Sequence, residues 1–133
     1  MVSRLNLSNR PENLKALREF LRNWGEQRGM SRPRLKSLEK AAAEIFNFIT
    51  NRVYRPGVPG SVAVILEDKG VRLRLVFEDD GPPYDAATLS ALSPNADPSP
   101  AGPNLSRIRE WSDSLVYYRT ADQKNRLVTF YTL

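Results

Sequence analysis

FEDDGPPYD, residues 77–85, is the stretch around which the rest of the chain is interpreted. An alternating apolar run leads into it, at Val71, Leu73, Leu75 and Phe77. Period-two alternation predicts a strand with these four side chains on one face. Two carboxylates follow, then Gly81, which allows close approach to the backbone, and two prolines, which end the strand. A carboxylate beside bare backbone suits a ligand that carries an amine, such as adenine; the alternative is an acidic turn between a strand and a helix.

The composition predicts one soluble domain and excludes several kinds of chemistry. The 133 residues are 41% hydrophobic and 26% charged, which is ordinary for a globular domain with a single core. No apolar run approaches the roughly 20 residues that span a bilayer, and residues 1–10 lack the apolar core of a signal peptide, so we expect a cytoplasmic protein without membrane attachment. The absence of cysteine and histidine excludes disulfides, Ser–His and Cys–His catalysis, and a zinc site.

The charge is distributed unevenly along the chain. Residues 1–55 contain twelve Lys or Arg against five Asp or Glu, a net charge of +7, and residues 56–133 contain eight against ten, a net charge of −2. A basic half suits nucleic acid, an acidic protein or a phosphorylated ligand, although solvated helix faces are the favoured explanation. A nucleic-acid-binding domain would add a recognition motif or aromatic residues among the basic ones. The sequence has neither, so we expect no nucleic-acid partner.

The periodicity of the first half predicts a strand, two helices and a hairpin. The expected elements are a strand at 4–8, a helix from Pro11 to about 27, a helix capped by Ser31 that ends before 55–57, and strands at 61–67 and 71–78. In the second strand, Arg72 and Arg74 alternate with the apolar set. We therefore expect one face of the sheet to be covered by helices and the other to be wet.

The second half adds a loop, a helix and a second hairpin. The expected elements are a short helix at 86–92, a proline-rich loop at 93–102, a helix at 104–112, and strands at 115–120 and 126–133. The whole order predicts an α+β fold, a two-layer sandwich with helices on one face of a mixed, mainly antiparallel sheet. We expect a single domain over residues 1–133.

Three segments of the chain resemble ATPase domains of the histidine-kinase-like (GHKL, or Bergerat) superfamily, and in particular the anti-sigma-factor serine/threonine kinases of bacterial partner switching. AEIFNFITNRVY, residues 43–54, stands where the family has its N-box helix. Residues 78–85 are close to the first glycine box in its Asp-Asp-Gly-Pro-Pro form. AGPNL, residues 101–105, stands where the second glycine box opens the last helix. The resemblance covers nearly the whole chain and implies a Bergerat-type fold.

The resemblance also implies roles for individual residues, with ATP or ADP as the ligand. Asp79 would accept a hydrogen bond from the adenine amine, and Gly81 would let the ring approach the backbone. Gly102 would lie by the phosphates at a helix N-terminus, where free N–H groups favour anions. Glu44 would orient or deprotonate an attacking serine hydroxyl. Arg52 would contact phosphate.

The phosphate end departs from the family pattern. The family places a magnesium-binding asparagine four residues after the glutamate, where this chain has Phe48, which cannot bind a hard cation. Asn47 is one residue early, about 100° round the helix, and Asn51 is three residues late on roughly the same face. Both are retained as candidate nucleotide-binding residues. In the second glycine box, Pro103 removes a backbone donor and Asn104 replaces a further glycine. These changes predict weakened Mg²⁺–ATP chemistry.

Two functions therefore stay open. One is an anti-sigma kinase that binds ATP, phosphorylates a serine on an antagonist protein and holds a sigma factor inactive. The other is a protein-binding module on the same fold with weak or no nucleotide binding, and in both cases the resemblance makes a homodimer an expectation. Glu44 has a structural alternative, which is pairing with an arginine at the edge of the layers. The aromatic residues interpreted as parts of the sheet rather than as a stacking platform are Tyr84, Tyr117, Tyr118 and Tyr131.

Overall fold

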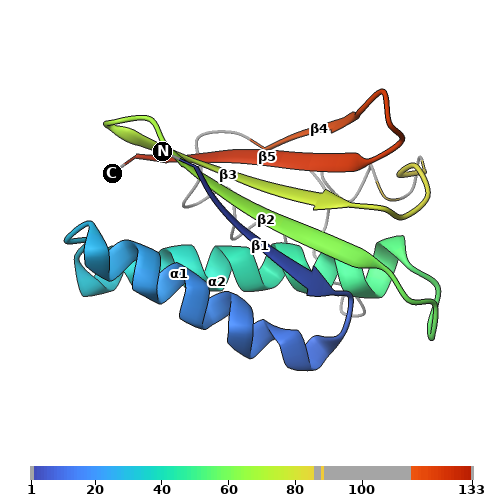
Figure 1. Ribbon diagram of the computed structural model, residues 1–133, viewed down its shortest axis with the longest axis horizontal. Coiled ribbons are helices and arrows are strands. Elements are labelled where there is room, and N and C mark those ends of the chain that lie inside the picture. The colour runs from blue at the N-terminus through green and yellow to red at the C-terminus, as the bar shows by residue number, and fades with distance from the viewer. Residues whose placement is uncertain (1, 86–87, 89–114, 133) are drawn as a thin grey trace.

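The computed structural model describes residues 2–85, 88 and 115–132. In this part of the chain two helices, α1 (Leu14–Gln27) and α2 (Arg32–Phe48), lie on one face of a five-stranded sheet (Figure 1). The strands are β1 (Val2–Ser8), β2 (Ser61–Asp68), β3 (Arg72–Asp79), β4 (Leu115–Arg119) and β5 (Asn125–Thr132). A 3₁₀ turn, η1 (Pro11–Asn13), precedes α1, and a π-helical turn, η2 (Ile49–Val53), continues α2. The predicted α+β sandwich is confirmed.

The sheet has the strand order β1-β2-β3-β5-β4, and each of the four ladders between described strands is antiparallel. β3 is the central strand, paired on one side with β2 and on the other with β5. In the register of β3 with β5, Phe77 faces Leu127 and Asp79 faces Asn125. The first acidic residue after the apolar run is therefore held in the middle of the sheet rather than at an edge.

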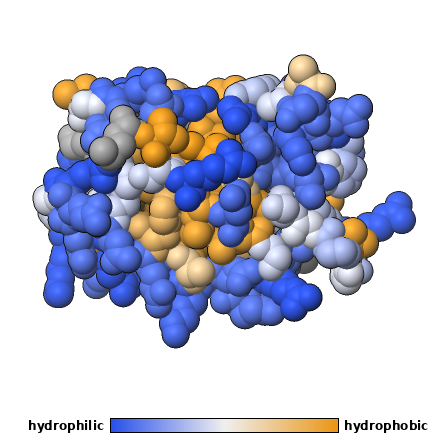
Figure 2. Space-filling model, viewed as in Figure 1, coloured by the Kyte–Doolittle hydropathy of each residue, from blue (hydrophilic) through white to orange (hydrophobic). Residues whose placement is uncertain are grey.

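The core lies between the helices and one face of the sheet, as the alternation predicts. From β3 it contains Leu73, Leu75 and Phe77, which are fully buried. The helices contribute apolar side chains at helical spacing, among them Leu17, Leu21, Trp24, Leu38, Ile45 and Phe48. Hydrophobic residues come to the surface in the middle of the view in Figure 2 and hydrophilic residues surround them. None of the described helices is long and apolar enough to cross a membrane.

The structure corrects three details of the predicted elements. Val71 is 75% exposed, because it lies in the turn after Gly70 rather than in β3. Ser31 stands at the N-cap of α2, but its side chain makes no capping hydrogen bond. The outer face of the sheet is not uniformly wet, because Ile65, Val76 and Val128 form a small buried cluster there. The helices expected at 86–92 and 104–112 and the loop between them lie outside the described residues.

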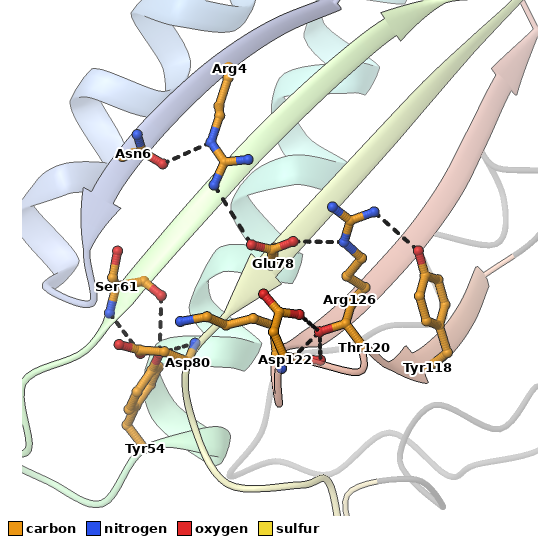
Figure 3. Close-up of polar contacts among 11 residues, drawn as sticks. Arg4, Asn6, Tyr54, Ser61, Glu78, Asp80, Tyr118, Thr120, Asp122 and Arg126 are labelled. Carbon is orange, nitrogen blue, oxygen red and sulfur yellow. Dashed lines mark hydrogen bonds and ion pairs between the residues drawn. The ribbon is translucent and has the colours of Figure 1, made fainter.

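The rest of the described outer face carries a chain of polar contacts across the sheet (Figure 3). Glu78 on β3 lies 3.7 Å from the Arg4 guanidinium of β1 and 2.7 Å from that of Arg126 on β5. Arg126 also donates to the hydroxyl of Tyr118 on β4 at 3.2 Å. These partly exposed pairs contribute little individually, about 0–1 kcal/mol each. The stability of the sheet therefore comes from the helix-facing core.

We predict that Leu75→Ala lowers the free energy of unfolding by about 2–5 kcal/mol, because it opens a cavity at a fully buried position in the central strand. Val71→Ala, four residues away at an exposed position, should change it by less than about 0.5 kcal/mol. Urea unfolding followed by circular dichroism measures both. Equal losses in the two variants would contradict the position of the core.

Candidate functional site

The candidate site is the acidic corner, residues 79–81, at the end of β3. Asp79 is the next helix-facing position after Phe77, and its side chain is only 1% exposed. Its Oδ1 accepts hydrogen bonds from the Gly81 backbone N–H at 3.0 Å and from the Asn125 amide at 2.8 Å. Its Oδ2 accepts one from the Tyr84 hydroxyl at 3.0 Å. The carboxylate is thus solvated by the protein itself.

The pKa values of the two neighbouring carboxyl groups of the corner are shifted in opposite directions. Burial raises the pKa of Asp79, and its three hydrogen bonds offset only part of this effect. Asp80 is exposed, and although partial burial opposes the change, hydrogen bonds from the Ser61 backbone N–H and the Tyr54 hydroxyl lower its pKa. Figure 3 shows Asp80 beside Ser61 and Tyr54. Asp79 therefore faces the layer interface, while Asp80 links the end of β3 to the start of β2.

Asn125 holds the corner to the β4–β5 hairpin. Its fully buried side-chain amide donates to Asp79 and to the Pro82 carbonyl, both at 2.8 Å. Its side-chain oxygen accepts from the Tyr117 hydroxyl at 2.7 Å and from the Arg119 guanidinium at 2.9 Å. The sequence alone does not single out Asn125, because its place opposite Asp79 depends on the pairing of β3 with β5.

An aromatic cluster fills the space between α2 and the corner. The Tyr84 ring stacks on Tyr117, with centroids 4.2 Å apart and planes inclined by 17°, and it meets Phe48 edge-on at 6.0 Å. Burial raises the pKa of Tyr84, and the charge of Asp79 raises it further, so the hydroxyl keeps its proton and donates. The interpretation of Tyr84 as a sheet residue is wrong, because it lies after β3 in irregular backbone and packs against Asp79.

Glu44 lies on α2 one helical turn before Phe48 and is half-buried. Burial raises the pKa of Tyr131 on β5, and the charge of Glu44 adds to this, so the two side chains are close enough to interact. On the other side, Phe48 meets the Tyr84 ring, and the Tyr84 hydroxyl donates to Asp79. Glu44 therefore lies on the helix that borders the acidic corner, one turn away from the residue that contacts the corner's aromatic cluster.

The other candidates on this helix are spread over different surfaces. Asn47 is half-buried, whereas Asn51 and Arg52 are exposed on the turn at 49–53. Asn51 lines a surface pocket of about 360 Å³ beside the β1–η1 connection. The expectation that Asn51 shares the face of the fully buried Phe48 is wrong, because the π-turn contains more residues per turn than an α-helix and changes the direction of the side chains that follow.

Of the two glycines that the resemblance places at the nucleotide, the structure describes Gly81. A Cβ added to Gly81 would lie 2.6 Å from Cγ1 of Val53, so the close approach that this glycine permits is made by the turn η2. Gly102, Pro103 and Asn104 lie outside the described residues.

The position at which the resemblance implies a magnesium ligand does not fit one. Phe48, at the position where the resemblance implied a ligand, is fully buried and packs against Tyr84. Mg²⁺ requires oxygen ligands in near-octahedral geometry, which a phenyl ring cannot supply. Residues 2–85, 88 and 115–132 contain no group of three or more acidic side chains that could hold a metal.

A comparison with protein families matches residues 7–130 to the family described as histidine kinase-like ATPase domain. The match extends from β1 to β5 and includes both Glu44 and the acidic corner. A search of curated proteins finds no match.

We predict that Asp79→Asn removes a pH-dependent loss of stability. Burial raises the pKa of Asp79 in the folded state, so ionising this carboxyl costs more in the folded than in the unfolded protein. The free energy of unfolding is therefore highest below about pH 4 and decreases as the pH rises through the raised pKa. An Asn carbonyl can accept from Gly81 and Asn125 while its amide donates to Tyr84. The variant should equal the wild type near pH 3 and be more stable at pH 7, in urea unfolding measured across this range.

Asp80→Asn is the matched control, and its effect has the opposite sign. The folded-state pKa of Asp80 is lowered, so this group stabilises the protein above about pH 4 and the contribution disappears as pH falls. Asp80→Asn should therefore be less stable than the wild type at pH 7. If Asp79→Asn were also less stable at pH 7, the inferred cost of the buried charge would be wrong.

Proposed function

Because the chain belongs to the histidine kinase-like ATPase domain family, we propose that it binds ATP or ADP at the acidic corner and acts as an anti-sigma regulatory protein of the serine-kinase-like type. In this role it would hold a sigma factor inactive and be released by an antagonist protein, as in bacterial partner switching. A homodimer is part of the proposal, by resemblance to the anti-sigma kinases.

The observation that carries the proposal is the buried, inward-facing carboxylate of Asp79. A carboxylate offers about four acceptor positions, and three are used by Gly81, Asn125 and Tyr84. The remaining position, on Oδ2, suits the exocyclic amine of adenine. Guanine presents a carbonyl oxygen at the corresponding ring position, which a carboxylate would repel. In the orientation that points the 6-position of the purine at Oδ2, the corner therefore favours adenine over guanine.

Glu44 supports the kinase part of the proposal. It is a half-buried carboxylate on the helix that borders the same interlayer space. A carboxylate in such a place can orient a serine hydroxyl or accept its proton. The role proposed for Glu44 requires no metal ion.

A second candidate function is a protein-binding module that does not transfer phosphate. It is favoured by Phe48, whose buried ring packs against Tyr84 where the kinases have a magnesium ligand. Magnesium separates the two candidates. Tighter ATP binding in the presence of Mg²⁺, with phosphoserine on the cognate antagonist, supports the kinase. Equal affinity with and without Mg²⁺ and no phosphoserine support the binding module.

We predict that Asp79→Asn weakens ADP binding by about tenfold to a hundredfold, since a hydrogen bond to a charged acceptor contributes about 1.5–3 kcal/mol. Isothermal titration calorimetry of the wild type and the variant measures the change. Asp68→Asn, in the β2–β3 hairpin at the other end of β3, is the matched control and should leave the affinity unchanged. ADP binding that survives Asp79→Asn would place the purine elsewhere.

A further inference from the structure

Tyr84 occupies the part of Asp79 that a purine amine would use. Its hydroxyl donates to Oδ2 at 3.0 Å, whereas Oδ1 accepts from Gly81 and Asn125. Asp79 is 1% exposed, so no ligand can reach the remaining acceptor position without a displacement. The question is which of the three donors is able to leave.

The connections of the three donors single out Tyr84. The Gly81 donor is a backbone N–H directly after β3. Asn125 is held on both sides of its side chain, by Asp79 and Pro82 as acceptors and by Tyr117 and Arg119 as donors. The Tyr84 hydroxyl has one described hydrogen bond, and the Tyr84 backbone, in an irregular segment, donates its N–H to the Tyr117 hydroxyl at 3.2 Å. The Tyr84 side chain is therefore the donor whose departure from Oδ2 would leave the end of β3, the Asn125 contacts and its own backbone bond in place.

The surroundings of the Tyr84 ring would also accept a purine. Its face stacks on Tyr117 at 4.2 Å, and its edge faces Phe48 at 6.0 Å. A purine is a flat aromatic ring with an amine at its edge, so it can both stack on Tyr117 and donate to Oδ2. On the far side of the corner, Val53 already occupies the approach to Gly81. If the Tyr84 ring moved away, the space that it leaves would lie next to Asp79 and against the face of Tyr117.

We propose, as an extension of the proposed nucleotide binding on which it rests, that the Tyr84 side chain competes with the adenine ring for Asp79 and Tyr117. Adenine nucleotides bind only to the form in which Tyr84 has left Oδ2. Tyr84 thus lowers the affinity for adenine nucleotides by stabilising the ligand-free form, and it sets the concentration range in which the protein responds to them.

The test compares ADP and IDP binding by calorimetry in the wild type, Tyr84→Phe and Tyr118→Phe. Tyr84→Phe keeps the ring but removes the competing donor, so ADP should bind about tenfold more tightly or better. IDP must displace the same ring, so it should gain by a similar factor. It should still bind more weakly than ADP in each protein, because it has no exocyclic amine to donate to Oδ2. Tyr118→Phe removes a hydroxyl bonded to Arg126 on the opposite face and should affect neither nucleotide.

The outcomes separate this inference from the proposed function. ADP binding of equal strength in the wild type and Tyr84→Phe overturns the competition and leaves nucleotide binding in place. Equal affinities for ADP and IDP in Tyr84→Phe also overturn it, because the amine would then not take the place of the hydroxyl at Oδ2. No ADP binding by any of the three proteins overturns both.

Circular dichroism and thermal melting confirm that each variant is folded. A ¹³C titration of Asp79 in Tyr84→Phe should show a higher pKa for its carboxyl than in the wild type, since a hydrogen bond to the carboxylate is lost.

Discussion

A buried carboxylate must be hydrogen-bonded, and this requirement organises the acidic corner. Leaving the charge of Asp79 without donors would cost several kcal/mol, so three donors converge on it. They come from the residue after the strand, the neighbouring strand β5 and the irregular segment that follows the two prolines. One side chain therefore links segments that are distant in sequence, and it does so at the end of the central strand, where the layers of helices and sheet meet.

The same contacts give the site two opposed properties. They stabilise the ligand-free corner, because the Tyr84 hydroxyl donates to Oδ2 of Asp79 and the Tyr84 ring stacks on Tyr117. They also oppose the proposed ligand, because a purine would have to replace both the bond and the stack. Its affinity would then be the difference between two similar sets of interactions, so we expect modest changes at Tyr84 or Tyr117 to have large effects on binding. A regulatory protein can be tuned in this way without any change in the residues that contact the ligand.

Local periodicity predicted the parts of the structure that depend on neighbours in sequence. The alternation Leu73, Leu75, Phe77 predicted the helix-facing side of β3, although Val71, in the same run, lies outside the strand. The helical stripes of α1 and α2 were likewise visible. Asn125 and the stacking of Tyr84 on Tyr117 were not, because both depend on pairing across the sheet. Asn51 was misplaced because no local signal in residues 49–53 indicated that α2 ends in a π-turn.

The adjacent carboxylates Asp79 and Asp80 show how the corner also specifies the register of the sheet. Successive residues of a strand point to opposite faces, so a slip of one residue would bring Asp80 into the core and expose Asp79. Each position has its own donors, Asn125 and Tyr84 for the inner carboxylate and Tyr54 and Ser61 for the outer one. A slipped sheet would leave both sets unpaired at once. The pair of acids therefore selects a single register of β3 with both β2 and β5, and Asn125 and Tyr84 converge on Asp79 only in that register.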